Sequence, residues 1–200
     1  MPLRPKPNPK PKPNSVPRPV TVALTGGIAA GKSEALAAFA RHGAATASSD
    51  EFVHRLLAED EDVRKAIRER WGEAAVGDRA RIAKIVFEDR SELDWLEQLL
   101  HPKTRELAQR WLGSTGASIE VVEIPLLFET GGEARFDKVV VVTAPHDVRE
   151  SRRAGFADRE ARLIPDEEKV ARADFAYVND GTLGELDAFV AGVVESLLSS

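Results

Sequence analysis

The sequence predicts an α/β fold in which a five-stranded parallel sheet lies between layers of helices. Short runs of apolar, often β-branched residues alternate with longer stretches of helix-forming residues. The short runs are continuously apolar, which is typical of strands that are covered on both faces, and therefore of a parallel sheet. One longer helical stretch, about residues 51–115, breaks the alternation and predicts a helical insertion between the second and third strands.

The alternation begins with an apolar run over residues 20–25, which predicts the first strand. A Gly-rich loop follows, and the Ala- and Leu-rich residues 34–40 then favour a helix that ends at Gly43. A weak second strand is expected over residues 44–48. The remaining strands are expected over residues 119–124, 138–143 and 175–178, before a closing helix over 183–198.

The insertion is expected to contain four helices. Gly72 and Gly77 interrupt its helical pattern. Ser91 is expected to be a helix N-cap, and Pro102 is expected at the first position of the next helix. The four predicted helices cover residues 51–71, 79–87, 91–100 and 102–112.

The composition is that of one globular domain behind a short basic tail. Residues 1–19 hold eight of the 12 prolines and no acidic residue, so they are expected to be disordered, with residues 20–200 as the domain. The net charge of −5 makes that domain acidic, which argues against general nucleic-acid binding. No apolar run is long enough to span a membrane, and the absence of cysteine fits a cytoplasmic location.

The most specific motif is a phosphate-binding loop (P-loop) between the first strand and the first helix. Residues 26–33 have the sequence Gly-Gly-Ile-Ala-Ala-Gly-Lys-Ser and fit the pattern G-x-x-x-x-G-K-[ST], which predicts a three-layer P-loop NTPase fold. Glycines let the backbone N–H groups approach phosphate oxygens, and the following helix adds its positive N-terminal end. Lys32 is expected to reach the β- and γ-phosphates, and Ser33 to hold Mg²⁺. The predicted nucleotide contacts are Gly27, Ile28, Ala29, Ala30, Gly31, Lys32, Ser33 and Glu34.

Further polar side chains are expected at the carboxyl ends of the strands, where ligands bind in folds of this kind. Asp50 follows the second strand and is a candidate general base for an acceptor hydroxyl, although an Asp there is also typical of a helix N-cap. Glu123, near the end of the third strand, is a candidate Mg²⁺ ligand through water, because a Glu inside an apolar strand is otherwise costly to bury.

Several arginines follow the fourth strand, namely Arg149, Arg152, Arg153, Arg159 and Arg162, and any of them is a candidate for a functional role. We expect residues 145–170 to form a short lid in which an arginine, together with Lys32, supplies positive charge for phosphoryl transfer. Arg152 is favoured for this catalytic role because it lies three residues after Arg149 and shares its helix face. Acidic residues are interleaved with these arginines, so a solvated helix face is the alternative.

Several further segments resemble those of the dephospho-coenzyme A kinases, and the resemblance covers about residues 20–198. The P-loop looks like the family's opening, and Asp50 falls at the family's strand-two aspartate. The most specific segments are His101-Pro102 and the Pro-Leu-Leu-Phe-Glu sequence at residues 125–129. The other similar segments are Asp78-Arg79 with Ile82 and Val86-Phe87, then Leu96-Glu97, and Ala173-Asp174 with Asn179 and Gly181.

The resemblance implies transfer of the ATP γ-phosphate to the ribose 3′-hydroxyl of dephospho-CoA, with Asp50 as the base. It implies ATP and dephospho-CoA as partners, with Mg²⁺ as the cofactor. It places Asn179 near the adenine of ATP. It also places the insertion and the strand-three loop over the acceptor, where the predicted contacts are Asp50, Arg79, His101, Pro125 and Leu126.

The sequence departs from the family pattern at the P-loop and the lid. Ala29 and Ala30 stand where the family usually has Gly and Ser, and Ala tolerates a positive φ less well than Gly, so the loop is expected to be slightly strained. The lid is shorter than is usual. Two alternatives therefore stay open: another P-loop kinase of small molecules, and a nucleotide-binding protein of impaired activity. We expect no nucleic-acid or membrane partner, and a monomer or weak oligomer.

Overall fold

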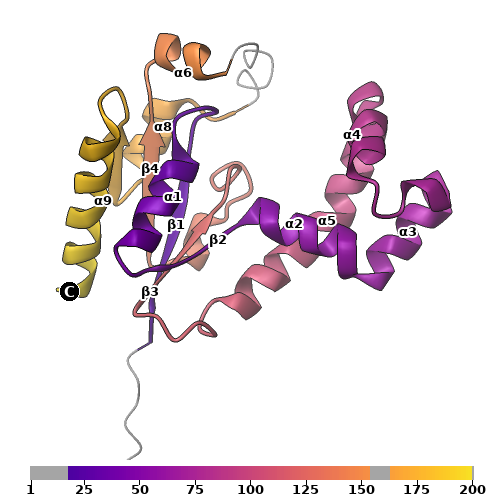
Figure 1. Cartoon of the computed structure of the whole chain (residues 1–200), viewed down its shortest axis with the longest axis horizontal. Coiled ribbons are helices and arrows are strands. Elements are labelled where there is room, and N and C mark those ends of the chain that lie inside the picture. The colour runs from indigo at the N-terminus through magenta and orange to yellow at the C-terminus, as the bar shows by residue number, and fades with distance from the viewer. Residues whose placement is uncertain (1–17, 154–162, 200) are drawn as a thin grey trace, which may run out of the picture.

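The computed structural model describes residues 18–153 and 163–199, and Figure 1 shows the arrangement of its helices and strands. Residues 1–17 of the tail predicted over 1–19, residues 154–162 of the predicted lid, and residue 200 lie outside the described residues. The elements are, in chain order, β1 Val20–Gly26, α1 Lys32–Arg41, β2 Ala45–Ser48, α2 Ser49–Glu59, α3 Glu61–Trp71, η1 Glu73–Ala75, α4 Arg79–Glu88, α5 Arg90–Trp111, β3 Ile119–Glu123, η2 Glu133–Arg135, β4 Lys138–Thr143, α6 His146–Arg152, α8 Asp166–Ala171, β5 Phe175–Val178 and α9 Leu183–Leu198.

The five strands form one sheet in the order β2-β3-β1-β4-β5, and every neighbouring pair is parallel. This confirms the predicted fold class. Leu24 of β1 lies opposite Glu123 of β3 and Val140 of β4. Ser48 of β2 also lies opposite Glu123. The carboxyl ends of the strands therefore meet at one edge, which is where the P-loop begins.

Both faces of the sheet are buried, as the continuous apolar runs predict. Val22 and Leu24 contribute to a core that α1 and α9 cover, and Phe39 of α1 is fully buried in it. Ala23, on the opposite face, packs with Leu127. That face is covered by the segment after β3, together with the start of α2 and the end of α5.

Helices α2–α5 form the insertion between β2 and β3, and they project from the sheet on the side away from α9 (Figure 1). They have a hydrophobic core of their own, distinct from the cores on the sheet. Its buried members are Leu56, Leu57, Val63, Ile67, Ala75, Ile82, Leu96 and Leu100.

Three helix boundaries in the insertion differ from the prediction. The single helix expected over residues 51–71 is two helices, because Asp60 stops α2 and caps α3 by accepting a hydrogen bond from Val63 N at 3.0 Å. Asp89, rather than Ser91, caps α5, since its carboxylate accepts the Ser91 N–H at 2.8 Å.

Pro102 lies inside α5 and does not begin a new helix. A helical proline removes one intrahelical hydrogen bond and usually costs about 3 kcal/mol or more. Leu96 and Leu100, in the turns before it, are buried in the core of the insertion, so tertiary packing holds the helix together through the proline.

Candidate active site

Two glycines fix the shape of the P-loop. Gly26 has a φ of +149°, and a Cβ there would lie 1.8 Å from the carbonyl oxygen of Val142. Gly31 has a φ of +102°, and a Cβ there would lie 2.2 Å from Nδ2 of Asn179. Both positions therefore require glycine, because the chain backs onto β4 at one end of the loop and onto the end of β5 at the other.

Among the described residues other than glycine, Ala29 is the one with a positive φ, which is +58°. A left-handed conformation costs an L-residue with a Cβ about 1–2 kcal/mol. The strain expected from the substitution of Ala for Gly in this loop is therefore present in the structure.

Lys32, the first residue of α1, folds back over the loop. Its Nζ donates to the carbonyl oxygens of Gly26 at 3.3 Å and Gly27 at 2.9 Å. Burial lowers the pKa of Lys32, the carboxylate of Glu123 opposes that shift, and the ammonium of Lys169 adds to it. Ser33 is exposed beside it at the N-terminus of α1, where the helix dipole favours an anion.

Glu123 ends β3 close to this lysine. Burial raises the pKa of Glu123, the charge of Lys32 lowers it, and the charge of Asp50 raises it further. Lys32, Glu123 and Asp50 therefore share one electrostatic environment at the edge of the sheet. An exposed hydroxyl at Ser33 and a half-buried carboxylate at Glu123 are oxygen donors of the kind that Mg²⁺ prefers.

Asp50 is the second residue of α2, and the structure removes the alternative that it caps this helix. The N-cap is Ser48, whose side chain accepts from Glu51 N, while the Glu51 carboxylate accepts from Ser48 N in a capping box. The Asp50 carboxylate is exposed and makes no hydrogen bond or ion pair with the described part of the chain. It is thus available to a ligand.

Asn179 is buried and holds the loop from behind. Its Nδ2 donates to the carbonyl oxygen of Ala30 at 2.8 Å. Its backbone N–H donates to the carbonyl oxygen of Thr143 at 2.7 Å. The structure therefore places Asn179 against the P-loop, next to the predicted nucleotide contacts.

The lid arginines occupy two different places. Arg152 lies behind the loop and donates to the carbonyl oxygens of Ala29 at 3.4 Å, Ala30 at 3.3 Å and Asn179 at 3.2 Å. Arg149 is only 7% exposed and lies beside the start of the loop, since a Cβ on Gly27 would be 3.1 Å from its Nη1.

A buried lysine that sequence reasoning missed lies next to Arg149. Lys169 of α8 is only 1% exposed, and its Nζ lies 3.6 Å from Glu129 and 3.8 Å from Asp166. Asp166 in turn lies 3.0 Å from where a Cβ of Gly27 would be. The alternative of a wholly solvated helix face is wrong for Arg149, which is buried, whereas Glu167 and Glu168 of α8 are exposed.

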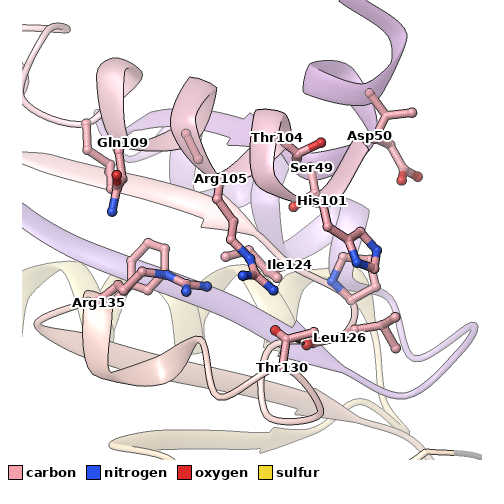
Figure 2. Close-up of a pocket in the computed structure, with 15 residues that line it drawn as sticks. Ser49, Asp50, His101, Thr104, Arg105, Gln109, Ile124, Leu126, Thr130 and Arg135 are labelled. Atoms are coloured by element: carbon pink, nitrogen blue, oxygen red, sulfur yellow. Dashed lines mark hydrogen bonds between the residues drawn. The ribbon is translucent and has the colours of Figure 1, made fainter. Parts of the chain in front are cut away.

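A pocket of about 320 Å³ lies between α5, the start of α2 and the segment after β3 (Figure 2). It contains four of the five predicted acceptor contacts, namely Asp50, His101, Pro125 and Leu126. The fifth, Arg79, is not among the lining residues, because it begins α4 on the outer part of the insertion. The remaining lining residues are Ser49, Val53, Thr104, Arg105, Ala108, Gln109, Leu112, Ile124, Thr130, Arg135 and Phe136.

Arg105 and Arg135 were not predicted as site residues. His101, Arg105 and Gln109 recur every four residues, so they share one face of α5, and Figure 2 shows all three directed toward the pocket. That spacing was the available signal for Arg105. Arg135 lies in an irregular segment whose position no sequence period indicates.

Two further observations concern membrane-spanning helices and clusters of metal ligands. Among the described residues, no helix combines the length and the apolar composition needed to cross a bilayer. The same residues contain no cluster of three or more His, Cys, Asp or Glu side chains arranged to hold a metal ion.

Comparison with known proteins identifies the family. The family model described as dephospho-CoA kinase matches residues 20–185. The dephospho-CoA kinase of Mesorhizobium japonicum is 38% identical over 197 residues, covering 89% of this chain and 96% of that protein. The solved structure of TT1252 from Thermus thermophilus has a TM-score of 0.74 and 31% identity, over 90% of this chain and 98% of that one. Dephospho-CoA kinase from Campylobacter jejuni shares the fold, with a TM-score of 0.66 and 24% identity over 88% and 96% of the two chains. The chain belongs to the dephospho-CoA kinase family.

Proposed function

We propose that this protein transfers the γ-phosphate of ATP to the ribose 3′-hydroxyl of dephospho-CoA. One observation carries the proposal beyond family membership. Asp50 lines the pocket that holds His101, Pro125 and Leu126, and its charge also acts on Lys32 of the P-loop. A hydroxyl bound in the pocket beside Asp50 would therefore face the end of a nucleotide held by the loop.

The nucleotide would bind along residues 26–34, with the loop amides around the phosphates. Lys32 would leave the carbonyl oxygens of Gly26 and Gly27 for the β- and γ-phosphate oxygens. Ser33 and Glu123 would hold Mg²⁺, Glu123 through water, since Mg²⁺ usually keeps several waters and binds substrate phosphates. The ion would neutralise charge that develops on the phosphate oxygens.

Asp50 would act as the general base. Its carboxylate accepts the proton of the 3′-hydroxyl, the new bond forms between O3′ and the γ-phosphorus, and the bond from that phosphorus to the β-γ bridging oxygen breaks. ADP leaves with the electrons of that bond. Asp50 is exposed and does not cap α2, so both of its carboxylate oxygens are open to the acceptor.

Of the candidate lid arginines, Arg159 and Arg162 lie outside the described residues, and the choice is between Arg149 and Arg152 because these two lie against the P-loop. Sequence reasoning favours Arg152, but its guanidinium already binds three backbone carbonyls behind the loop. Arg149 lies beside Gly27, whose carbonyl oxygen accepts a hydrogen bond from Lys32 Nζ. We therefore assign the transition-state role to Arg149 and the support of the loop to Arg152.

The family assignment disfavours another class of P-loop kinase, and the intact Lys32, Ser33 and Asp50 disfavour an impaired protein. A cytoplasmic location and a monomeric or weakly oligomeric state remain predictions from the sequence. The test is a coupled assay of ADP release over a panel of acceptors, with mass spectrometry of the product. We expect one added phosphoryl group on the 3′-oxygen of dephospho-CoA. Turnover of a nucleoside monophosphate without formation of CoA would contradict the proposal.

A further inference from the structure

The pocket beside Asp50 is positively charged, in a chain that is acidic as a whole. Among its lining residues, Asp50 is the one carboxylate, while Arg105 and Arg135 contribute two guanidinium groups. Figure 2 shows these two arginines entering the middle of the pocket from opposite walls, with His101 and Asp50 at one end. Arg105 comes from α5 and Arg135 from η2, so two separate parts of the fold direct positive charge into the same space.

Arg105 differs from other arginines of its helix. Arg90 and Arg110 each pair with a carboxylate four residues away, Asp94 and Glu106 respectively. The positions three and four residues from Arg105 on either side hold His101, Pro102, Ala108 and Gln109, none of which is acidic. Within the described part of the chain, Arg105 consequently has no ion-pair partner.

Arg135 has an acidic neighbour that is already engaged. Glu133, two residues before it in η2, pairs with Arg172 instead. Gly132 leaves room for the Arg135 side chain, since a Cβ there would lie 2.7 Å from Nη2 of Arg135. Within the described residues, Arg135 also has no carboxylate partner, and its guanidinium remains directed into the pocket.

From these contacts we infer that Arg105 and Arg135 form a diphosphate subsite in the pocket, an inference that rests on the proposed function. Guanidinium groups bind phosphate oxygens bidentately, and Arg105 and Arg135 are both exposed at the pocket, where a ligand can reach them. The acceptor carries a diphosphate on the 5′ side of the ribose whose 3′-hydroxyl would face Asp50.

The spacing along α5 agrees with this assignment. Arg105 lies one helical turn beyond His101, a rise of about 6 Å. A ribose held between Asp50 and His101 would therefore direct its 5′ substituent along α5 toward the guanidinium groups. Arg105 and Arg135 then act on binding of the acceptor, and Asp50 acts on the chemical step.

The test compares Arg105→Gln and Arg135→Gln with Arg110→Gln as a matched control. Arg110 lies on the same helix, is exposed and does not line the pocket. Calorimetry with dephospho-CoA measures binding, and steady-state kinetics measures kcat and both KM values. We expect each pocket variant to weaken dephospho-CoA binding about 10- to 100-fold. The KM for ATP and the melting temperature should stay at wild-type values, and Arg135→Lys should recover part of the loss.

Salt dependence gives a second readout. Binding of dephospho-CoA to the wild type should weaken as salt rises, and the double variant should lose most of that dependence. Pocket variants that bind dephospho-CoA within twofold of the wild type, or that raise the KM for ATP equally, would overturn the inference. A wild type that binds dephospho-CoA but does not phosphorylate it would overturn the proposed function alone.

Discussion

The phosphate end of the site and the acceptor pocket hold their cationic side chains in opposite ways. At the phosphate end, Lys32 and Arg152 are hydrogen-bonded to backbone carbonyls, and Lys169 lies against two carboxylates. In the acceptor pocket, Arg105 and Arg135 have no ion-pair partner among the described residues. The first region is organised by the protein itself, whereas the second is complete only with the charge of its ligand. Substitutions at the phosphate end should therefore affect stability as well as turnover, and substitutions of Arg105 and Arg135 should affect binding of the acceptor alone.

The largest effect is expected at Asp50, where the two regions meet. Asp50→Asn should lower kcat about 10²- to 10⁴-fold, because it removes the base. The melting temperature and the affinity for ATP should not change, since Ser48 and Glu51 cap α2 without Asp50. Stopped assays at saturating substrates, calorimetry with ATP and thermal denaturation measure the three quantities.

Ser48→Ala is the matched control for Asp50→Asn. It removes the cap and should cost about 0.5–2 kcal/mol of stability while leaving the base in place. Near-normal turnover by Asp50→Asn would show that the carboxylate has no role in proton transfer.

Large effects of two different kinds are expected from the two lid arginines, on kcat for Arg149 and on stability and the KM for ATP for Arg152. Arg149→Ala should lower kcat about 10²- to 10³-fold at saturating ATP, because its contact strengthens as charge develops on the phosphate. Arg152→Ala should instead lower the melting temperature and raise the KM for ATP, because it frees three carbonyls that hold the P-loop. The reverse pattern would return the catalytic role to Arg152.

Glu123→Gln should separate stability from activity. Burial raises the pKa of Glu123 above its ordinary 4.5. At a pH between the ordinary pKa and the raised pKa, Glu123 is protonated in the folded protein and ionised in the unfolded chain. In that window the contribution of Glu123 to stability falls as pH rises, and above it the buried charge destabilises the fold. Glu123→Gln should therefore melt higher than the wild type at neutral pH but not at pH 4.

The same variant should require about 10- to 100-fold more Mg²⁺ for half-maximal activity. Turnover by the wild type should fall as pH drops through the raised pKa, since protonated Glu123 is a poorer partner for the ion. An unchanged Mg²⁺ requirement would remove Glu123 from the metal site.

The sequence predicted the shape of the P-loop better than the positions of Arg135 and Lys169, for a physical reason. P-loop geometry depends on local constraints, such as the glycines at 26 and 31, which appear as a short motif. Arg135 and Lys169 acquire their surroundings from tertiary packing that no local pattern encodes. A glutamate inside an apolar strand is also an incomplete indication of a site residue. Glu120, in the same strand as Glu123, is fully buried but is satisfied by Gly113 N at 2.6 Å and Thr115 Oγ1 at 2.6 Å, away from the site.

Tertiary packing also explains the errors in the insertion. The pattern around Pro102 favours a helix start, yet α5 continues because its apolar face packs in the core of the insertion. Asp60 had no recognised role, although its carboxylate ends one helix and starts the next, and Lys103 Nζ donates to it at 3.0 Å. A cap within a long helical pattern is hard to distinguish from a solvated polar residue.

The smallest effect tests whether the phosphate end is strained by its own sequence. Ala29→Gly should relieve a left-handed conformation that costs about 1–2 kcal/mol, while the greater entropy of glycine in the unfolded chain offsets about 0.4–1 kcal/mol of this gain. The net stabilisation is then about 0.5 kcal/mol, a rise in melting temperature of roughly 1–2 °C for a chain of this size. Ala37→Gly, at an exposed position inside α1, should lower the melting temperature by about 2–4 °C, because glycine is a poor helix former. Thermal denaturation of the two variants should therefore show shifts of opposite sign in melting temperature, although both variants replace alanine with glycine. Equal losses of stability would show that the left-handed turn at residue 29 carries no strain, and that the phosphate end is held as easily with alanine as with glycine.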